Sequence, residues 1–259
     1  MTQYRIKQWL WAVPVSVAAV LMAGCQEKPA PQAQVDTVAK AQKQTIPLIQ
    51  AKVIRVELPK KQFCDAEGCT QYDLQTVQTQ VPWINEYFLA RLQKDVPDAF
   101  STDKKISAET SAAKGLNQNT VYVQFIAQHT NLATFVIQSY IYNAGAAHGM
   151  SHQEFVTFDL NTHKRLALTD ILKPNVEAKV ADALYEANSN WLQQHNIERA
   201  KLQLSDNYYY GVNGIVFVYP LYELASYAEG MSELTLPYLM TKDLIKAEYL
   251  PSLPEYSNQ

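Results

Sequence analysis

Two histidines four residues apart, His148 and His152, are candidates for a metal site or for acid–base catalysis. They follow a run of small residues from Asn143 to Ala147, and a pair of imidazoles can bind a metal ion or transfer protons. On a regular strand, however, side chains four residues apart are separated by about 13 Å, which is too far to share one ion. The alternative is a structural role, with His148 hydrogen-bonded to its own turn. We keep His148 as a candidate binding residue and expect no metal site and no catalytic residue.

The short sequence signatures of common enzymes are absent. The chain has no H-E-x-x-H, no phosphate-binding G-x-x-x-x-G-K-[ST] and no dinucleotide-binding G-x-G-x-x-G. The stretch from Gly149 to Gln153 lacks the second glycine of a G-x-S-x-G nucleophile elbow. Carboxylate pairs leave no short signature, so these absences do not exclude an enzyme. We expect a protein that is not an enzyme and that uses no cofactor.

A cluster of tyrosines near the C-terminus could form a binding surface. Within twenty residues the chain carries Tyr208, Tyr209, Tyr210, Tyr219, Tyr222 and Tyr227. Tyrosine offers a large contact area and an orienting hydroxyl, which suits a binding surface but also a sheet with one solvated face. Helical spacing over residues 220–227 would point Tyr222 away from the apolar side chains and leave it exposed. Tyr209, Tyr222 and Tyr227 are therefore candidate binding residues.

Cys64 and Cys69 enclose a short loop that contains Gly68, and they are the only cysteines after Cys25. Because disulfides persist in exported proteins, this spacing predicts a bridge that closes the end of a hairpin. A metal site or a redox pair is the alternative. Zinc needs four ligands, with no histidine or second cysteine pair nearby, and redox motifs usually place two residues between their cysteines. We expect a structural disulfide.

Residues 1–24 have the order of charges and apolar residues that is typical of a secretory signal peptide. Arg5 and Lys7 precede an apolar stretch from Trp9 to Ala23, which is short for a membrane span. Removal of this segment changes the formal net charge from −3 to −5. A mildly acidic chain excludes a nucleic-acid binder that relies on a basic surface. With 47% hydrophobic and 18% charged residues, the remainder can form a packed core.

The signal peptide ends in Met22-Ala23-Gly24-Cys25, which resembles the bacterial lipoprotein signal, with Met22 in place of the usual leucine. That resemblance implies that Cys25 is acylated, with palmitate among the acyl chains, and holds the protein on a membrane. The alternative is a plain secreted protein with a chance cysteine at the cleavage site. Gln26 at the next position implies, by the same resemblance, the outer membrane, facing the periplasm or the cell surface.

Hydrophobic periodicity predicts the helices and strands that carry these residues. Residues 25–45 are polar and predict a flexible tether. Helical spacing predicts one helix from Pro82 to Pro97 and a longer one after Pro174, whose apolar stripe continues from Val176 to Leu192. Alternating residues predict strands at 49–58, 70–81, 121–127, 135–141, 156–160, 214–219 and 233–236. The predicted fold is α+β, with a mostly antiparallel sheet and a long amphipathic helix packed on one face.

Seven segments stand in a recognisable order: Ala146 to Gly149, Phe155 to Thr162, Leu168 to Leu172, Gly214 to Phe217, Pro220 to Ala225, Tyr227 to Gly230 and Leu236 to Tyr238. They resemble the RsiV C-terminal domain family, which implies such a domain over residues 120–250. Residues 46–119 resemble, more distantly, the smaller domain found beside the catalytic domain of the deacetylase PdaC, and residues 251–259 are expected to be a loose tail. No sigma-factor-binding segment and no deacetylase domain are expected.

The resemblance implies an extracytoplasmic binding module, since one family member senses lysozyme by binding it. We therefore expect a membrane-anchored lipoprotein of the cell envelope that binds a lysozyme-like protein or peptidoglycan. The binding surface would lie near His148 and the tyrosine-rich segment, and the acidic chain would attract a basic partner modestly. The alternative is a cell-wall hydrolase or deacetylase that uses His148 with a carboxylate.

Overall fold

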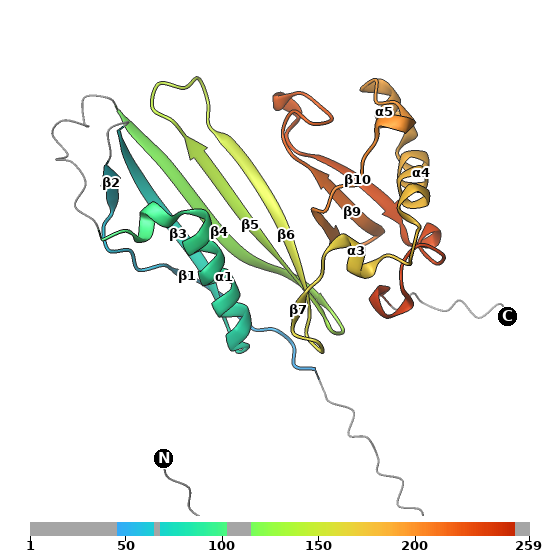
Figure 1. The fold of residues 1–259 in the computed structure, drawn as a ribbon, viewed down its shortest axis with the longest axis horizontal. Coiled ribbons are helices and arrows are strands. Elements are labelled where there is room, and N and C mark those ends of the chain that lie inside the picture. The colour runs from blue at the N-terminus through green and yellow to red at the C-terminus, as the bar shows by residue number, and fades with distance from the viewer. Residues whose placement is uncertain (1–45, 65–67, 103–114, 252–259) are drawn as a thin grey trace, which may run out of the picture. The chain divides into compact units, whose positions relative to one another are not determined.

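The computed structural model describes residues 46–64, 68–102 and 115–251 (Figure 1). The predicted signal peptide, the lipidation site Cys25 and the tether lie outside these residues, as does the predicted tail beyond residue 251. Within the described ranges, no helix is both long enough and apolar enough to cross a membrane.

A large sheet forms the first half of the fold. Its strands follow the order β1-β3-β4-β5-β6-β7, and β2 also pairs with β3. All pairings are antiparallel except that of β3 with β4, which is parallel. The strands are β1 (Ala51–Arg55), β2 (Gln62–Cys64), β3 (Cys69–Thr79), β4 (Leu116–His129), β5 (Leu132–Tyr142), β6 (Met150–Asp159) and β7 (Lys164–Arg165).

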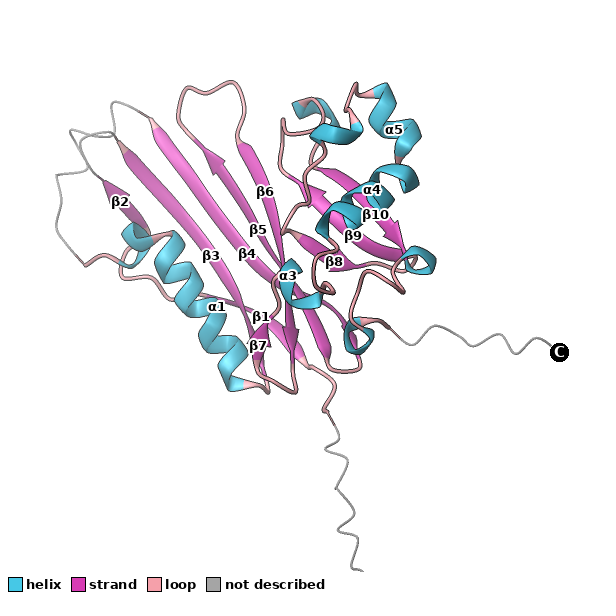
Figure 2. Ribbon diagram, turned by 45° about the vertical axis from the view of Figure 1, so that its right-hand side comes forward, coloured by secondary structure: helices cyan, strands magenta, loops and turns pink. Residues whose placement is uncertain are grey.

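The parallel pair requires a crossover, and this crossover carries the helix that covers one face of the sheet (Figure 2). Helix α1 (Pro82–Asp95) begins with a proline, is followed by the short helix η1 (Pro97–Phe100), and buries Ile84, Phe88 and Leu92. The Phe88 ring lies 5.1 Å from that of Phe135 on β5 and 5.7 Å from that of Phe158 on β6. The helix predicted from Pro82 is therefore confirmed.

A disulfide closes the hairpin of β2 and β3. Cys64 and Cys69 face each other in the strand register and are bonded, with their Cα atoms 4.1 Å apart. The predicted disulfide is therefore confirmed. Residues 65–67 of its loop lie outside the described ranges.

A second, smaller sheet has the order β10-β9-β8. Its strands are β8 (Tyr208–Tyr210), β9 (Gly214–Tyr219) and β10 (Ser232–Pro237). One face packs on α4 (Glu177–Ala187) and α5 (Ser189–Gln194) through a core that includes Leu184, Leu192, Phe217 and Leu234. Tyr208, Tyr210 and Tyr219 are buried in this core. The other elements of this half are α3 (Leu168–Ile171), η3 (Arg199–Lys201), η4 (Tyr227–Glu229), η5 (Tyr238–Met240) and η6 (Ala247–Tyr249).

The long helix predicted after Pro174 is broken at Asn188. The Asn188 amide donates to the backbone oxygens of Leu184, at 2.7 Å, and Thr235, at 3.0 Å, and its oxygen accepts from the Thr235 N–H. Helix α4 ends before this residue, whose side chain is paired with the backbone of β10 at the edge of the small sheet. The apolar stripe itself continues, because Leu184 and Leu192 are buried on either side of the break.

The α+β prediction is confirmed, with two sheets in place of one. The predicted boundary between residues 119 and 120 falls inside β4, and the large sheet continues across it. One hydrophobic cluster lies between α1 and the large sheet, and the other lies between the small sheet and its helices.

Candidate functional site

Three of the four candidate binding residues come together in one aromatic stack. His148 lies in the loop between β5 and β6, whereas Tyr222 and Tyr227 lie between β9 and β10. The ring centroids of His148 and Tyr227 are 4.1 Å apart, and those of Tyr227 and Tyr222 are 5.6 Å apart, with stacked geometry in both pairs. We call these three residues the aromatic stack.

The conformation of Tyr222 was not predicted. Residues 220–227 form turns and the start of η4, so the expected helix there is wrong. Tyr222 has a φ angle of 70°, and 56% of the residue is exposed. Its predicted exposure is therefore confirmed, although the turn and not a helix provides it. A bulky residue with positive φ is uncommon and costs free energy, so this conformation is held by its surroundings.

Gly149 allows the two halves of the stack to meet. Its carbonyl oxygen accepts a 2.8 Å hydrogen bond from the Tyr227 hydroxyl and lies 3.2 Å from His148 Nδ1. A Cβ atom at this position would overlap the ring of Tyr140 on β5. Tyr140 is thus a further aromatic residue beside the stack, and nothing in the alternating pattern of its strand distinguished it from other strand tyrosines.

A network of hydrogen bonds holds the segment that carries Tyr227. The Ser226 hydroxyl donates to Glu229 Oε1 at 2.8 Å, and Glu229 Oε2 lies 2.6 Å from His195 Nε2, which follows α5. His195 Nδ1 in turn lies 2.8 Å from the backbone oxygen of Trp191, on whose ring the imidazole stacks. The turn is therefore fastened to α5, although neither His195 nor Glu229 had been singled out in the sequence.

His195 is positioned to carry a charge. Both ring nitrogens face acceptors, and only the imidazolium form can donate from both. The hydrogen bond to the Trp191 carbonyl, followed by that to Glu229, raises the pKa of His195 above its ordinary value. The hydrogen bond from His195 lowers the pKa of Glu229 in return.

These shifts predict a pH dependence of the segment around Tyr227. A raised histidine pKa stabilises the fold fully below about 6.5, and this contribution is lost as pH rises through the raised pKa. A lowered glutamate pKa contributes fully above about 4.5 and is lost as pH falls through it. Amide hydrogen exchange at residues 226–230, corrected for its intrinsic pH dependence, should therefore be slowest between about pH 4.5 and 6.5 and should speed up at higher pH.

An NMR titration of His195 provides the direct measurement. In the Glu229→Gln variant, the His195 pKa should fall, because the charge of its partner is removed while the Trp191 carbonyl remains. An unchanged His195 pKa in that variant would contradict the assigned contact.

Tyr209, the fourth candidate, is not part of the stack. Its ring stacks on Phe155 of β6, with centroids 4.3 Å apart, and its hydroxyl donates to Glu233 Oε2 at 3.2 Å. Burial raises the pKa of Tyr209 to about 12. It therefore contributes to the contact between the small sheet and β6.

Asn207 joins the small sheet to the edge of the large one. Its amide nitrogen donates to the Gln153 carbonyl at 2.7 Å, and its amide oxygen accepts from the Phe155 N–H at 2.8 Å. The Asn207 N–H donates to Ser205 Oγ. One side chain thus takes the place of a neighbouring strand along β6.

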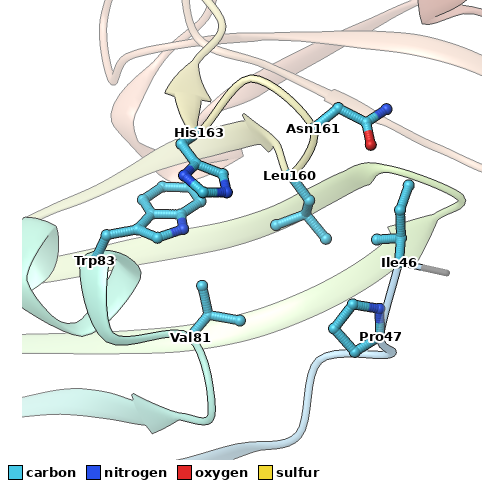
Figure 3. A pocket seen from close by; sticks show the side chains of 7 residues that line it. All are labelled: Ile46, Pro47, Val81, Trp83, Leu160, Asn161 and His163. Atoms are coloured by element: carbon cyan, nitrogen blue, oxygen red, sulfur yellow. The ribbon is translucent and has the colours of Figure 1, made fainter. Parts of the chain in front are cut away.

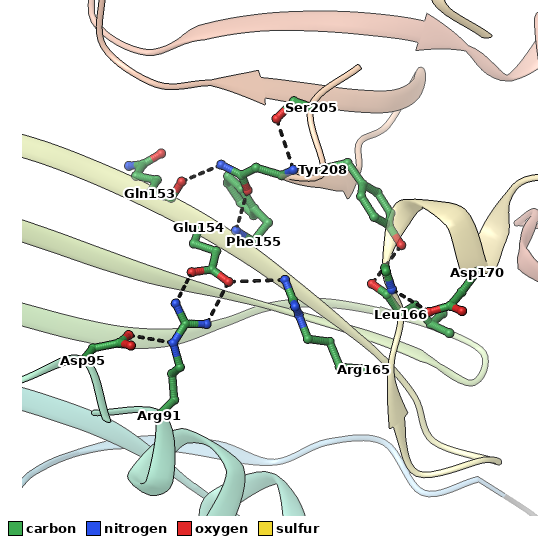
Figure 4. Close-up of polar contacts among 12 residues, drawn as sticks. Arg91, Asp95, Gln153, Glu154, Phe155, Arg165, Leu166, Asp170, Ser205 and Tyr208 are labelled. Atoms are coloured by element: carbon green, nitrogen blue, oxygen red, sulfur yellow. Dashed lines mark hydrogen bonds and ion pairs between the residues drawn. The ribbon is translucent and has the colours of Figure 1, made fainter. Parts of the chain in front are cut away.

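The opposite side of β6 is tied to α1. Arg91 donates to both carboxylate oxygens of Glu154, at 3.0 and 2.7 Å, and Arg165 lies 3.3 Å from the same carboxylate (Figure 4). The hydrogen bond to Glu154 is the largest of several effects that raise the pKa of Arg91. Strand β6, which lies beside the aromatic stack, is therefore held by Arg91 and Arg165 through Glu154 and by Asn207 along its edge.

A hollow of about 420 Å³ lies between β6 and the segment 227–233. Its lining includes Ser151, Gln153, Tyr227, Met231 and Glu233. Its size falls in the range of small-ligand sites. Among the described residues, no group of three or more histidine, cysteine, aspartate or glutamate side chains is arranged to hold a metal ion.

A smaller hollow, of about 170 Å³, lies where the described chain begins (Figure 3). It is lined mainly by apolar side chains, among them Ile46, Pro47 and Leu160, and by the Trp83 indole, which stacks on His163 with centroids 5.3 Å apart. None of the candidate residues borders it.

Residues 169–239 match the family model described as "Protein of unknown function (DUF3298)". The match extends from α3 to η5 and includes the small sheet and the segment with Tyr222 and Tyr227. It agrees over these residues with the resemblance to the RsiV C-terminal domain family. His148 lies before the matched residues, so the aromatic stack combines the DUF3298 domain with the large sheet.

The fold resembles solved structures over a larger part of the chain than residues 169–239. A DUF3298 family protein from Pseudomonas aeruginosa PAO1 is 20% identical, with a TM-score of 0.61 over 81% of this chain and 99% of that chain. A member of the same family from Bacteroides fragilis NCTC 9343 is 17% identical, with a TM-score of 0.56 over 77% of this chain and 94% of that chain. At these identities the likeness concerns the fold alone. No curated protein matches the chain.

Proposed function

We propose that this protein is a membrane-anchored lipoprotein of the cell envelope and acts as a non-enzymatic binding module for a lysozyme-like protein or for peptidoglycan. The observation that carries the proposal is the aromatic stack. Its three residues come from segments about 75 residues apart in the chain, and Tyr222 remains more than half exposed.

The stack has the properties of a contact surface. Its rings are fixed by each other and by the hydrogen bond from Tyr227 to Gly149, so little side-chain entropy remains to be lost on binding. Tyrosines in such positions are common among the residues that dominate binding energy. The positive φ of Tyr222 is a further indication, because strained backbone clusters at functional sites.

The environment of His148 favours binding over catalysis. One face of its ring is covered by Tyr227, and its Nδ1 atom faces the carbonyl of the next residue. A general base needs an orienting carboxylate or similar group, whereas the contacts of His148 within the described chain are an aromatic ring and a peptide carbonyl.

The anchor and the location rest on the sequence. The lipoprotein-like signal that ends at Cys25 supports acylation of this residue, and Gln26 after it supports attachment to the outer membrane, with the folded part facing the periplasm or the surface. The net charge of −5 without the signal peptide supports modest attraction of a basic protein partner.

Replacing Tyr222 with alanine should separate binding from stability. The free energy of unfolding should change by less than about 0.5 kcal/mol, because the side chain is exposed and alanine bears a similar cost at the same positive φ. Binding should weaken by more than about 1 kcal/mol. The measurements are thermal unfolding and a pull-down of the full-length protein, in detergent, with lysozymes and with insoluble peptidoglycan.

Leu239→Ala is the matched control, since Leu239 is 91% exposed and lies outside the stack. It should leave both measurements unchanged. If Tyr222→Ala is folded and binds every partner found as tightly as the wild type, the proposed surface is wrong.

A further inference from the structure

Two hollows lie side by side along β6 and share part of their lining. The hollow between β6 and residues 227–233 shares Ser151 and Gln153 with a second hollow of about 220 Å³. The second lies over β4, β5 and β6 and is lined by Thr120, Tyr122, Gln138 and Tyr140. We call the combined depression the sheet groove. It crosses three strands, which corresponds to about 10 Å at the usual strand spacing, and then continues to Glu233.

The sheet groove offers hydrogen-bonding groups that the protein itself does not use. Within the described ranges, the side chains of Thr120, Gln138, Ser151 and Gln153 have no hydrogen-bond partner. Hydroxyls and carboxamides both donate and accept. A ligand that carries many hydroxyls can therefore replace water on these groups and form several hydrogen bonds without breaking any within the protein.

The charge of the sheet groove excludes anionic ligands. No lysine or arginine lines either hollow. Its two carboxylates are already bound within the protein, Glu229 to Ser226 and His195 and Glu233 to the Tyr209 hydroxyl. His152 also lines the second hollow, but it alternates with Ser151 and Gln153 along β6, so its side chain belongs to the other face of the strand. A phosphate or sulfate group would therefore find no lysine or arginine to pair with, whereas an uncharged polar ligand needs no counter-charge.

The edge of β6 excludes an added peptide strand at this point. The Gln153 N–H donates to Met231 Sδ, and the Gln153 carbonyl and the Phe155 N–H are paired with Asn207. An extended peptide that binds by strand addition needs these backbone groups to be free. A ligand in the sheet groove would therefore bind to side chains and not to the backbone of β6 at this point.

We propose that the sheet groove binds a short uncharged oligosaccharide. Each sugar ring has an apolar C–H face that can lie on a tyrosine ring and a rim of hydroxyls that can bond to amides and hydroxyls, and the groove provides both. Tyr122 and Tyr140 supply the aromatic surfaces, and Gln138 and Gln153 supply the hydrogen bonds. The inference rests on the proposed binding function and narrows its ligand to the glycan.

The test is calorimetric titration of the full-length protein with the trimer of N-acetylglucosamine. The detergent must lack a sugar headgroup, since such a headgroup would compete. The wild type should bind saturably at millimolar or lower concentration. Gln138→Ala and Gln153→Ala should each weaken binding about fivefold, which corresponds to one hydrogen bond. Gln78→Ala, an exposed strand glutamine outside both hollows, is the matched control and should bind like the wild type.

Absence of saturable binding, or binding that neither groove variant weakens, would overturn the inference. If Gln153→Ala is unfolded by thermal denaturation, Gln138→Ala carries the test alone. Should a lysozyme-like protein bind in a Tyr222-dependent way while the trimer does not, the glycan assignment fails and the proposed function stands. Should neither the trimer, peptidoglycan nor a lysozyme bind, both fail.

Discussion

Replacing Asn207 with alanine should lower the free energy of unfolding by about 3 kcal/mol. The substitution leaves the Gln153 carbonyl and the Phe155 N–H without their partner, between two packed sheets. A buried peptide group without a hydrogen bond costs about 1 to 3 kcal/mol. The two groups affected here are half-buried, so each should cost an amount in the lower half of that range. The loss should also loosen the contact through which Tyr209 stacks on Phe155.

Urea unfolding of the full-length protein and two further variants measure this effect. Asn207→Asp keeps an acceptor for the Phe155 N–H but cannot donate to the Gln153 carbonyl, so it too should be destabilised. Asn161→Ala removes an exposed asparagine side chain and should change stability by less than about 0.5 kcal/mol. A loss of less than 1 kcal/mol in Asn207→Ala would mean that side-chain packing alone joins the sheets.

Replacing Cys25 with alanine should remove the protein from the membrane fraction almost completely. Each buried methylene of an acyl chain contributes about 0.8 kcal/mol, so two or three chains make attachment essentially permanent and their loss all-or-none. The variant should accumulate as an unprocessed precursor or as a soluble product. Fractionation of cell membranes and the mass of the N-terminal peptide provide the measurements.

Cys64→Ala is the matched control, because it removes a cysteine that forms the disulfide with Cys69 and not the predicted lipidation site. It should remain with the outer membrane. If Cys25→Ala still sediments with the outer membrane, the lipoprotein assignment is wrong.

The local elements of this fold could be predicted from the sequence because they depend on neighbours in the chain. The spacing of Ile84, Phe88 and Leu92 indicates which face of α1 is buried, and the alternation around Val121 and Val123 predicts β4. The disulfide between Cys64 and Cys69 was predictable for the same reason, since a short loop brings its ends together whatever the rest of the fold does.

The break at Asn188 and the conformation of Tyr222 arise from tertiary contacts. Helical spacing around each residue favours a continuous helix, but Asn188 forms its hydrogen bonds with Thr235, which is 47 residues away. Tyr222 keeps a positive φ where its ring stacks on Tyr227. Local propensity is weak, so a few long-range contacts can override it.

The candidate site, too, could be predicted only in part from the sequence. The residue types made His148, Tyr222 and Tyr227 candidates, because imidazole and phenol rings have few roles and are therefore conspicuous in a sequence. Their meeting in one stack, the addition of Tyr140 through Gly149, and the separation of Tyr209 depend on how the small sheet docks on β6. That docking is made by the Asn207 side chain and by packing between distant segments, and neither leaves a periodic pattern in the sequence.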